Sequence, residues 1–308
     1  RTDSVWNYKF IEDYFSPSGT AAKKGGIEFD LKKAELKNIL FIKKDAWLGE
    51  DMVIKLKQFS LDADEINFTR KNIAANSITI IEPLFSIRNY TKNKQTTPDV
   101  GTTTTAVDSL LKWNRESWVF TINEVNITDG VFKTEKQSDL PALASFDGKH
   151  IEFSKINARF KNIKWNKDTV TAQTAITARE RSGLVIKKLN ADVVMHPQTM
   201  EFNNLLLQTN NSTLKDRFVM RYKKMSDLGD FIHLVKLESN FIESEIDSDD
   251  LTFFAPSLGT WKKNIKIAGK IRGTIDELKA ESLIVQAGKN TLLNGDITLS
   301  GLPHINET

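Results

Sequence analysis

The chain has 308 residues, of which 40% are hydrophobic and 27% charged, which is the composition of a folded protein rather than a disordered one. Its net charge of +3 is small and its basic residues are spread along the chain, so the sequence indicates no nucleic-acid partner. The absence of cysteine excludes disulfides, thiolate metal sites and a cysteine nucleophile. Because the chain starts at Arg1 and contains no run of about 18 apolar residues, we expect a processed form or fragment whose membrane anchor lies elsewhere.

The first 26 residues are predicted to form a helix followed by a linker. Residues 3–15 place Val5, Trp6, Phe10 and Ile11 on a wide apolar face. We expect this helix to cap an edge or end of a sheet. An interfacial membrane or partner helix is the alternative, although its polar face holds few basic residues. Residues 16–26 are rich in Gly, Ser and Lys, which is typical of a linker.

After Gly26 the hydrophobic pattern changes to a period of two, the spacing of a strand with one buried face. Ile54 and Leu56 alternate with lysines, and the same alternation recurs along the rest of the chain. Turn residues such as Asn294-Gly295 separate the runs, which recur about every 8–12 residues, as in an all-β meander. Sustained helical periodicity does not interrupt them, so a doubly wound parallel sheet is not expected.

Two later segments have a different pattern. Residues 223–231 are predicted to form a short helix. Residues 248–261 are predicted to begin a helix with Asp249 or Asp250 as the N-cap and to end their apolar stretch at Pro256. The polar stretch 92–105 is predicted to be a disordered loop.

These patterns divide the chain into four parts: a helix and linker (1–26), a first β segment (27–90), a flexible polar loop (91–112) and a second β segment (113–308). Within the two β segments, short stretches share one style, in which an apolar strand is followed by Asn and another apolar strand. The stretches at Asn38, Asn126 and Asn157 are examples. Such loose similarity favours a repetitive β architecture in which each strand contacts mainly its neighbours.

The chemistry-bearing residues form no recognisable catalytic or metal-binding pattern. The histidines His150, His196, His233 and His304 lie tens of residues apart, outside any HxH or HExxH spacing. Acidic clusters around Asp62 and Asp247 are interpreted as a solvated strand face and a helix N-terminus. We therefore expect no enzyme activity, no metal and no cofactor.

The apolar sheet face is left as the main feature of the sequence. A sheet of this size can cover such a face by forming a sandwich, a barrel, a solenoid or a trough whose interior holds a ligand. The period alone does not choose among these. If the sheet forms a trough, the predicted lining residues are Ile54, Leu56, Leu61, Phe120, Ile122, Phe160, Ile176, Ala191, Val193, Met195, Ile265 and Ile267.

Two stretches resemble a known family. Residues 77–87 (SITIIEPLFSI) resemble the strand, Glu/Asp-Pro, strand signature of the AsmA-like superfamily. Residues 146–207 contain FSKINARFKNIKW, SGLVIKKLNADVVM and MEFNNLLLQTNNSTL, a succession of strands similar to that of TamB-like translocation and assembly module proteins of Bacteroidota. The order of these elements is more specific than any one of them, and the resemblance covers most of residues 27–301.

The resemblance implies an elongated, curled, antiparallel β-sheet, shaped like a taco, with an apolar groove and few short helices. It implies a place in the periplasm of a diderm bacterium, with an inner-membrane anchor outside this chain. It also implies a role in outer-membrane biogenesis, through transport of phospholipids whose acyl chains lie in the groove. The alternative is assembly of outer-membrane proteins with a BamA- or TamA-like barrel partner.

Three hypotheses therefore remain open from the sequence. The first is a lipid-conducting groove and the second is an assembly scaffold whose edge strand pairs with a client. The third is a closed solenoid or sandwich that binds carbohydrate, which would need exposed aromatic platforms. The tryptophans are scattered, and Trp165, at the end of a strand, is expected to be a core or rim residue.

Overall fold

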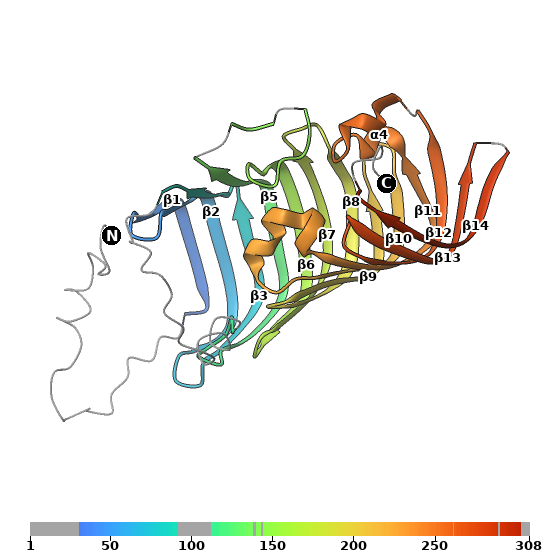
Figure 1. Cartoon of the computed structure of the whole chain (residues 1–308). Coiled ribbons are helices and arrows are strands. Elements are labelled where there is room, and N and C mark those ends of the chain that lie inside the picture. The colour runs from blue at the N-terminus through green and yellow to red at the C-terminus, as the bar shows by residue number, and fades with distance from the viewer. Residues whose placement is uncertain are drawn as a thin grey trace, which may run out of the picture.

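The computed structural model describes residues 31–91, 112–137, 140–142, 144–260, 262–288 and 290–302. Within these ranges the chain forms one curled sheet of 14 strands with a few short helical turns, so the predicted mainly-β class is confirmed (Figure 1). The predicted N-terminal helix and linker, and the predicted polar loop at 92–105, lie outside the described residues.

The strands are long, up to 18 residues, and most of them have one half-buried face. They are β1 (Lys33–Asp45), β2 (Glu50–Asn67), β3 (Asn72–Ile81), β4 (Leu84–Asn89), β5 (Val119–Lys136), β6 (Glu152–Asn166), β7 (Thr169–Glu180), β8 (Val185–His196), β9 (Thr199–Gln208), β10 (Thr213–Arg221), β11 (Lys236–Asp247), β12 (Asn264–Gly273), β13 (Glu277–Ala287) and β14 (Thr291–Ser300). The predicted break at Asn294-Gly295 is wrong, because both residues lie inside β14.

Most neighbouring strands pair antiparallel in chain order, but one part of the sheet does not. β4 continues in the direction of β3, beyond Glu82 and Pro83, and both strands pair parallel with β5. The prediction of an antiparallel sheet is therefore wrong at this point. A parallel neighbour requires a long return connection, and 29 residues separate Asn89, the end of β4, from Val119, the start of β5.

The sheet is a single layer in which extensive contacts between strands are confined to hydrogen-bonded neighbours. Thirteen strands lie side by side, with β4 off this path, so the sheet spans about 58 Å at ~4.8 Å per strand. A single layer can bury apolar side chains only by curling around them. The most buried cluster, Ala191, Val193 and Leu205 with the residues packed against it, lies on β8, β9 and β10 near the middle of the curl.

Short irregularities inside the strands allow the apolar residues to stay on one face. Leu56 and Phe59 lie three residues apart in β2, so strict alternation would place them on opposite faces. Their partners on β1 are Ile39 and Leu36, on either side of Asn38, which has a φ of 54°. We infer that this left-handed residue resets the alternation, because both runs continue into apolar rows on the neighbouring strands.

Left-handed residues of the same kind occur on five successive strands in the C-terminal half of the sheet. They lie side by side and form a continuous line, which we call the seam. Register shifts occur beside these residues in the pairings of β8 to β14, and β-bulges of this kind bend strands and increase their twist. The seam therefore contributes to the curl. Its residues, from β9 to β13, are Asn204, Asp216, Glu243, Gly269 and Ser282.

The two predicted late helices are present but shorter than expected. Residues 222–235, here called the strap, connect β10 to β11 and carry η1 (Met225–Asp230) and α3 (Phe231–Leu234). The β11–β12 connection carries α4 (Ser248–Leu251) and η2 (Pro256–Thr260). The prediction of Asp249 or Asp250 as N-cap is wrong, because Asp247 caps α4 by accepting a hydrogen bond from the Asp249 amide.

Candidate functional site

The candidate site is the apolar face of the curled sheet, which we define by one continuous row of paired residues. The row crosses the sheet from β2 to β14, and each member is directly opposite the next. Paired residues lie on the same face, so the row is an unbroken apolar strip. Its members are Ile66, Ile73, Phe120, Trp165, Val170, Met195, Met200, Met220, Leu237, Gly273, Leu278 and Leu299.

All twelve predicted lining residues lie on this apolar face. Phe120 and Met195 belong to the row itself, and alternation along β7 and β8 places Ile176, Ala191 and Val193 on the same face. Pairing across neighbouring strands places the other seven predicted residues on the same face. The remaining predicted residues are Ile54, Leu56, Leu61, Ile122, Phe160, Ile265 and Ile267.

Their exposure differs along the groove. Ala191 and Val193 are 6% and 9% exposed because Leu205 and its neighbours pack against them, so they belong to a closed core. The other predicted residues are half-buried and present part of their surface. Contact of any of the twelve with a lipid stays a prediction.

Several hydroxyl groups on the apolar face have backbone partners, which makes this face less polar than its composition suggests. Thr174 donates to the Ala191 carbonyl at 3.2 Å, and Ser239 donates to the Arg217 carbonyl at 2.9 Å. The Ser244 hydroxyl, 1% exposed, accepts from the Lys215 amide at 2.9 Å. Groups already paired in this way do not need to bond to a ligand, so the surface suits a hydrocarbon chain.

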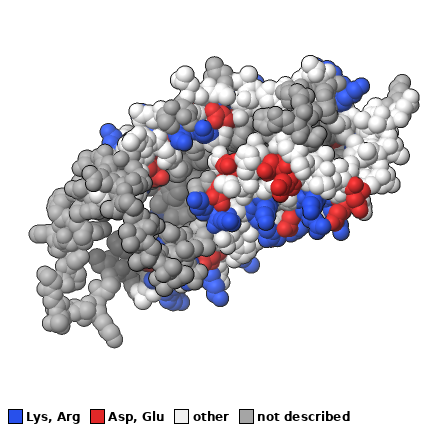
Figure 2. All heavy atoms as spheres, in the orientation of Figure 1, with Lys and Arg blue, Asp and Glu red and all other residues white. Residues whose placement is uncertain are grey.

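The polar face carries cross-strand ion pairs, whereas the apolar face holds a buried carboxylate, Glu180, which is 1% exposed and opposite Phe153. Arg159 pairs with Glu124 at 2.7 Å, and Arg221 pairs with Glu238 at 2.8 Å. The hydrogen bond from Arg159 lowers the pKa of Glu124, and the bond from Arg221 lowers the pKa of Glu238. Figure 2 shows acidic and basic side chains intermingled on the surface that it presents.

The strap leaves the sheet at one end of the strands and reaches a connection at their opposite end. A methyl group added at Gly148, in the β5–β6 connection, would lie 3.6 Å from the carbonyl oxygen of Gly229 in the strap. In Figure 1 this part of the strap lies in front of β6 and β7. The first and last residues of the strap, Tyr222 and Val235, are buried, so both of its ends are fixed to the sheet. We infer that the strap bridges the groove at its middle.

Two further connections meet over the sheet at the end of the strands where β11 finishes. The amide of Phe146 donates to the carbonyl of Phe253 at 2.7 Å, and the rings of Phe146 and Phe254 are 5.5 Å apart. Asp250, 5% exposed, holds α4 to the β9–β10 turn by accepting bonds from Asn211 and Ser212. The β5–β6 and β11–β12 connections thus meet, although the strands they join lie far apart in the sheet order.

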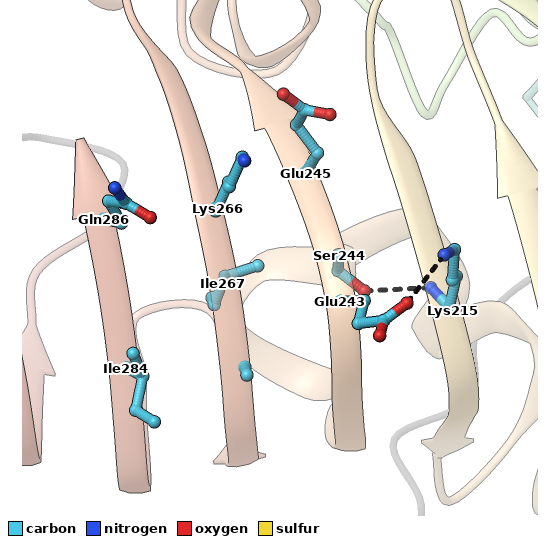
Figure 3. A pocket seen from close by; sticks show the side chains of 9 residues that line it. Lys215, Glu243, Ser244, Glu245, Lys266, Ile267, Ile284 and Gln286 are labelled. Carbon is cyan, nitrogen blue, oxygen red and sulfur yellow. Dashed lines mark hydrogen bonds and ion pairs between the residues drawn. The ribbon is translucent and has the colours of Figure 1, made fainter. Parts of the chain in front are cut away.

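A separate hollow of about 460 Å³ lies beside the seam, on the face that carries Glu245, Lys266 and Gln286 (Figure 3). Lys215 and Glu243 form an ion pair at 3.3 Å at one side of it. Five of its nine lining residues carry a charge or an amide, whereas Ile267, Ala268 and Ile284 are apolar, so this hollow is mixed in character.

The described histidines make local contacts. His150, 8% exposed, bonds through Nδ1 to Asp147 and through Nε2 to the Lys136 carbonyl. His196 bonds to Thr169, and His233 bonds to Asp230. Within the described ranges there is no group of three or more His, Asp or Glu side chains placed to hold a metal.

Sequence reasoning missed an aromatic cluster at one end of several strands. The ring centroids of Phe68 and Trp118 are 5.9 Å apart, those of Trp118 and Phe120 are 6.1 Å apart, and those of Phe120 and Trp165 are 5.1 Å apart. Trp165, expected to be a core or rim residue, is half-buried near the end of β6. The available signal was that aromatic residues recur at the ends of strands next to basic turns.

Comparison with known proteins adds no assignment to this geometry. A scan against protein-family models found no match, and a search of curated proteins found no match. Among the described helices, none has the length and apolar character needed to cross a bilayer.

Proposed function

We propose that this protein shields lipid acyl chains in the groove formed by its curled sheet. The observation that carries the proposal is the continuous apolar row from Ile66 to Leu299. At ~0.8 kcal/mol per buried CH₂, removing a 16-carbon chain from water is worth about 12 kcal/mol. Because the row is continuous, an acyl chain lying along it would meet an apolar residue at each strand from β2 to β14.

On this proposal the ligands are phospholipids, and the protein carries them between the inner and outer membranes of a diderm bacterium. The resemblance to AsmA-like and TamB-like proteins supports this part of the proposal, together with its periplasmic location and an inner-membrane anchor outside this chain. The proposed role uses no catalytic residue and no cofactor, since the ligand is moved unchanged.

The test compares two neighbouring residues of β7 that lie on opposite faces. Ile176→Asp places a charge on the apolar face, whereas Ala175→Asp places the same charge on the exposed polar face. We expect native mass spectrometry to detect bound phospholipid in the wild-type protein and in Ala175→Asp, and at least tenfold less in Ile176→Asp. The folded wild type remaining free of lipid after incubation with phospholipid would refute the proposal.

Photo-crosslinking provides a second readout that does not depend on a charge. A benzophenone amino acid at Phe160 should crosslink to lipid, whereas the same probe at Arg159, on the polar face of β6, should not. Equal labelling at both positions would indicate non-specific adsorption.

The scaffold alternative is favoured by a different observation, the two outer strands of the sheet. In the described structure β1 and β14 each pair on one side only, and an open strand edge can bind another strand. Leu40 of β1 is 60% exposed and Leu292 of β14 is 71% exposed. Photo-probes at these two positions should capture an outer-membrane barrel partner if the alternative holds, even when Ile176→Asp has removed the lipid.

A further inference from the structure

The aromatic cluster lies at one end of several strands and forms part of a mixed aromatic and basic surface. Three connections meet there: the β2–β3 turn (68–71), the segment before β5 (112–118) and the β6–β7 turn (167–168). We call this surface the aromatic rim. Its exposed and half-buried aromatic residues are Phe68, Trp113, Trp118, Phe120 and Trp165.

The rim is built as a fixed surface. Asp168 accepts bonds from the amides of Trp113 and Asn114 at 2.7 and 3.1 Å, which ties the segment before β5 to the β6–β7 turn. The Asn114 side chain in turn bonds to the amide and the carbonyl of Trp118. The relative positions of the rings are thus set by backbone hydrogen bonds.

The rings have the placement of interfacial side chains. Trp165 donates its indole N–H to the Lys167 carbonyl at 3.1 Å, so its polar atom is satisfied at the edge while its ring stacks on Phe120. Phe68 is 57% exposed in the β2–β3 turn, and its ring packs edge-on against Trp118. Aromatic side chains with an apolar body and a polar tip are enriched at the surfaces of bilayers.

The charges of the same three connections are predominantly positive. They contain five basic residues and two acidic ones, Glu116 and Asp168, and Asp168 is engaged with backbone amides. Two of the basic residues are ion-paired, Arg70 with Glu65 and Lys71 with Glu116 at 3.4 Å. A positive surface beside exposed aromatic rings complements an anionic lipid headgroup layer. The basic residues are Arg70, Lys71, Lys112, Arg115 and Lys167.

The rim is also continuous with the apolar face. Phe120 and Trp165 belong both to the aromatic cluster and to the continuous row that runs toward Leu299. A lipid leaving a bilayer at this edge would meet apolar surface at once and would not cross a band of charge.

We infer that the aromatic rim rests on the surface of an anionic lipid bilayer and forms a side entrance through which acyl chains reach the groove. The entrance role rests on the proposed function, whereas the bilayer contact does not. The partner is therefore a lipid surface, recognised by its negative charge and by the interfacial layer into which aromatic rings insert.

The experiment measures flotation of the whole chain with vesicles of phosphatidylcholine alone or with 30% phosphatidylglycerol. We expect binding to the anionic vesicles that weakens in high salt. At about fivefold in affinity per basic residue near the surface, Lys112→Gln with Lys167→Gln, two exposed basic residues of the rim, should weaken binding about 25-fold. Phe68→Asp should also weaken it by removing an inserting ring and adding a negative charge.

Matched controls come from the far end of the sheet. Leu292→Asp alters an exposed apolar residue of β14, and Lys279→Gln removes an exposed positive charge of β13. Both controls should bind vesicles like the wild type, and circular dichroism should show every variant folded. The inference fails if the folded wild type ignores anionic vesicles, or if the controls lose as much binding as the rim variants. Binding only to native membranes that retain their proteins would also overturn it, in favour of a protein partner.

Failure of this inference is distinguishable from failure of the proposed function. Rim variants should still take up phospholipid supplied from detergent, because the groove is unchanged. Ile176→Asp should lose groove lipid but still float with anionic vesicles.

Discussion

Gly269 offers the sharpest test of the seam that bends the C-terminal strands. Its φ of 132° lies in a region that side-chain-bearing residues rarely adopt, and a Cβ there would lie 2.8 Å from the Ser282 carbonyl oxygen and 2.9 Å from the Leu283 Cα. We expect Gly269→Ala to cost about 1–3 kcal/mol for the backbone conformation and about 1–3 kcal/mol for displacing β13. The central expectation is about 4 kcal/mol.

That loss is large enough to measure by thermal unfolding. At ~2.1 cal/mol/K per residue, one-step unfolding of a chain of 308 residues has an entropy of about 0.65 kcal/mol/K, so 4 kcal/mol lowers Tm by about 6 °C. Gly295→Ala is the matched control, because Gly295 lies in the adjacent strand β14 with nothing within 4 Å of the added methyl group. It should change stability by about 0.5 kcal/mol or less. Equal Tm values for the two variants would refute the claim that the seam requires glycine at 269.

Three further predictions concern other parts of the fold. The hydrogen bond to Asp230 raises the pKa of His233, so an NMR titration should give a midpoint above 6.5 that falls toward 6.5 in Asp230→Asn. Since the pKa of His233 is raised in the folded protein, the stabilisation by this pair is complete below pH 6.5 and is lost as the pH rises through the folded pKa. An unchanged titration midpoint in Asp230→Asn would contradict the assignment of the raised pKa to Asp230. Asp250→Ala should cost about 2–4 kcal/mol by leaving the amides of Asn211 and Ser212 without their acceptor, with faster hydrogen exchange at 209–212 and 248–254 but not in β1–β3. Asp168→Ala should release the segment before β5 from the β6–β7 turn, which limited proteolysis would detect as new cleavage near Trp113.

The sequence was most informative about which residues share a face. Alternation within each run, such as Ile54 with Leu56 or Ala191 with Val193, predicts a common face, and register pairing places all twelve predicted residues on it. Strict alternation fails between Leu56 and Phe59, because the reset depends on the φ of Asn38 in the neighbouring strand. Asn is enriched at such positions, but of the recurring residues Asn38, Asn126 and Asn157 only Asn38 has a positive φ, so that pattern did not locate the resets.

Features that depend on distant parts of the chain were beyond the sequence. The parallel pairing of β3 and β4 with β5 has no local signature, because the residues of β5 alternate as they would in an antiparallel strand. The strap contact between Gly148 and Gly229 requires the curl itself. The aromatic rim combines turns from residues 68–71, 112–118 and 167–168, which only the folded sheet brings together.

The extent of burial along the apolar face also needed the structure. Composition does not distinguish Val193, which is closed over by Leu205 and its neighbours, from Ile176, which stays partly open. Both are apolar residues at inward positions of adjacent strands, and only the local tightness of the curl separates them.

The single-layer construction has a consequence for the reach of such a protein. Because each strand depends mainly on its two neighbours, inserting one hairpin would lengthen the sheet by about 9.6 Å without requiring the other strands to repack. Loss of a hairpin would shorten it by the same step. The length of the sheet is therefore adjustable in units of two strands, and on the proposed function gain or loss of one hairpin would match a change in the distance between the two membranes.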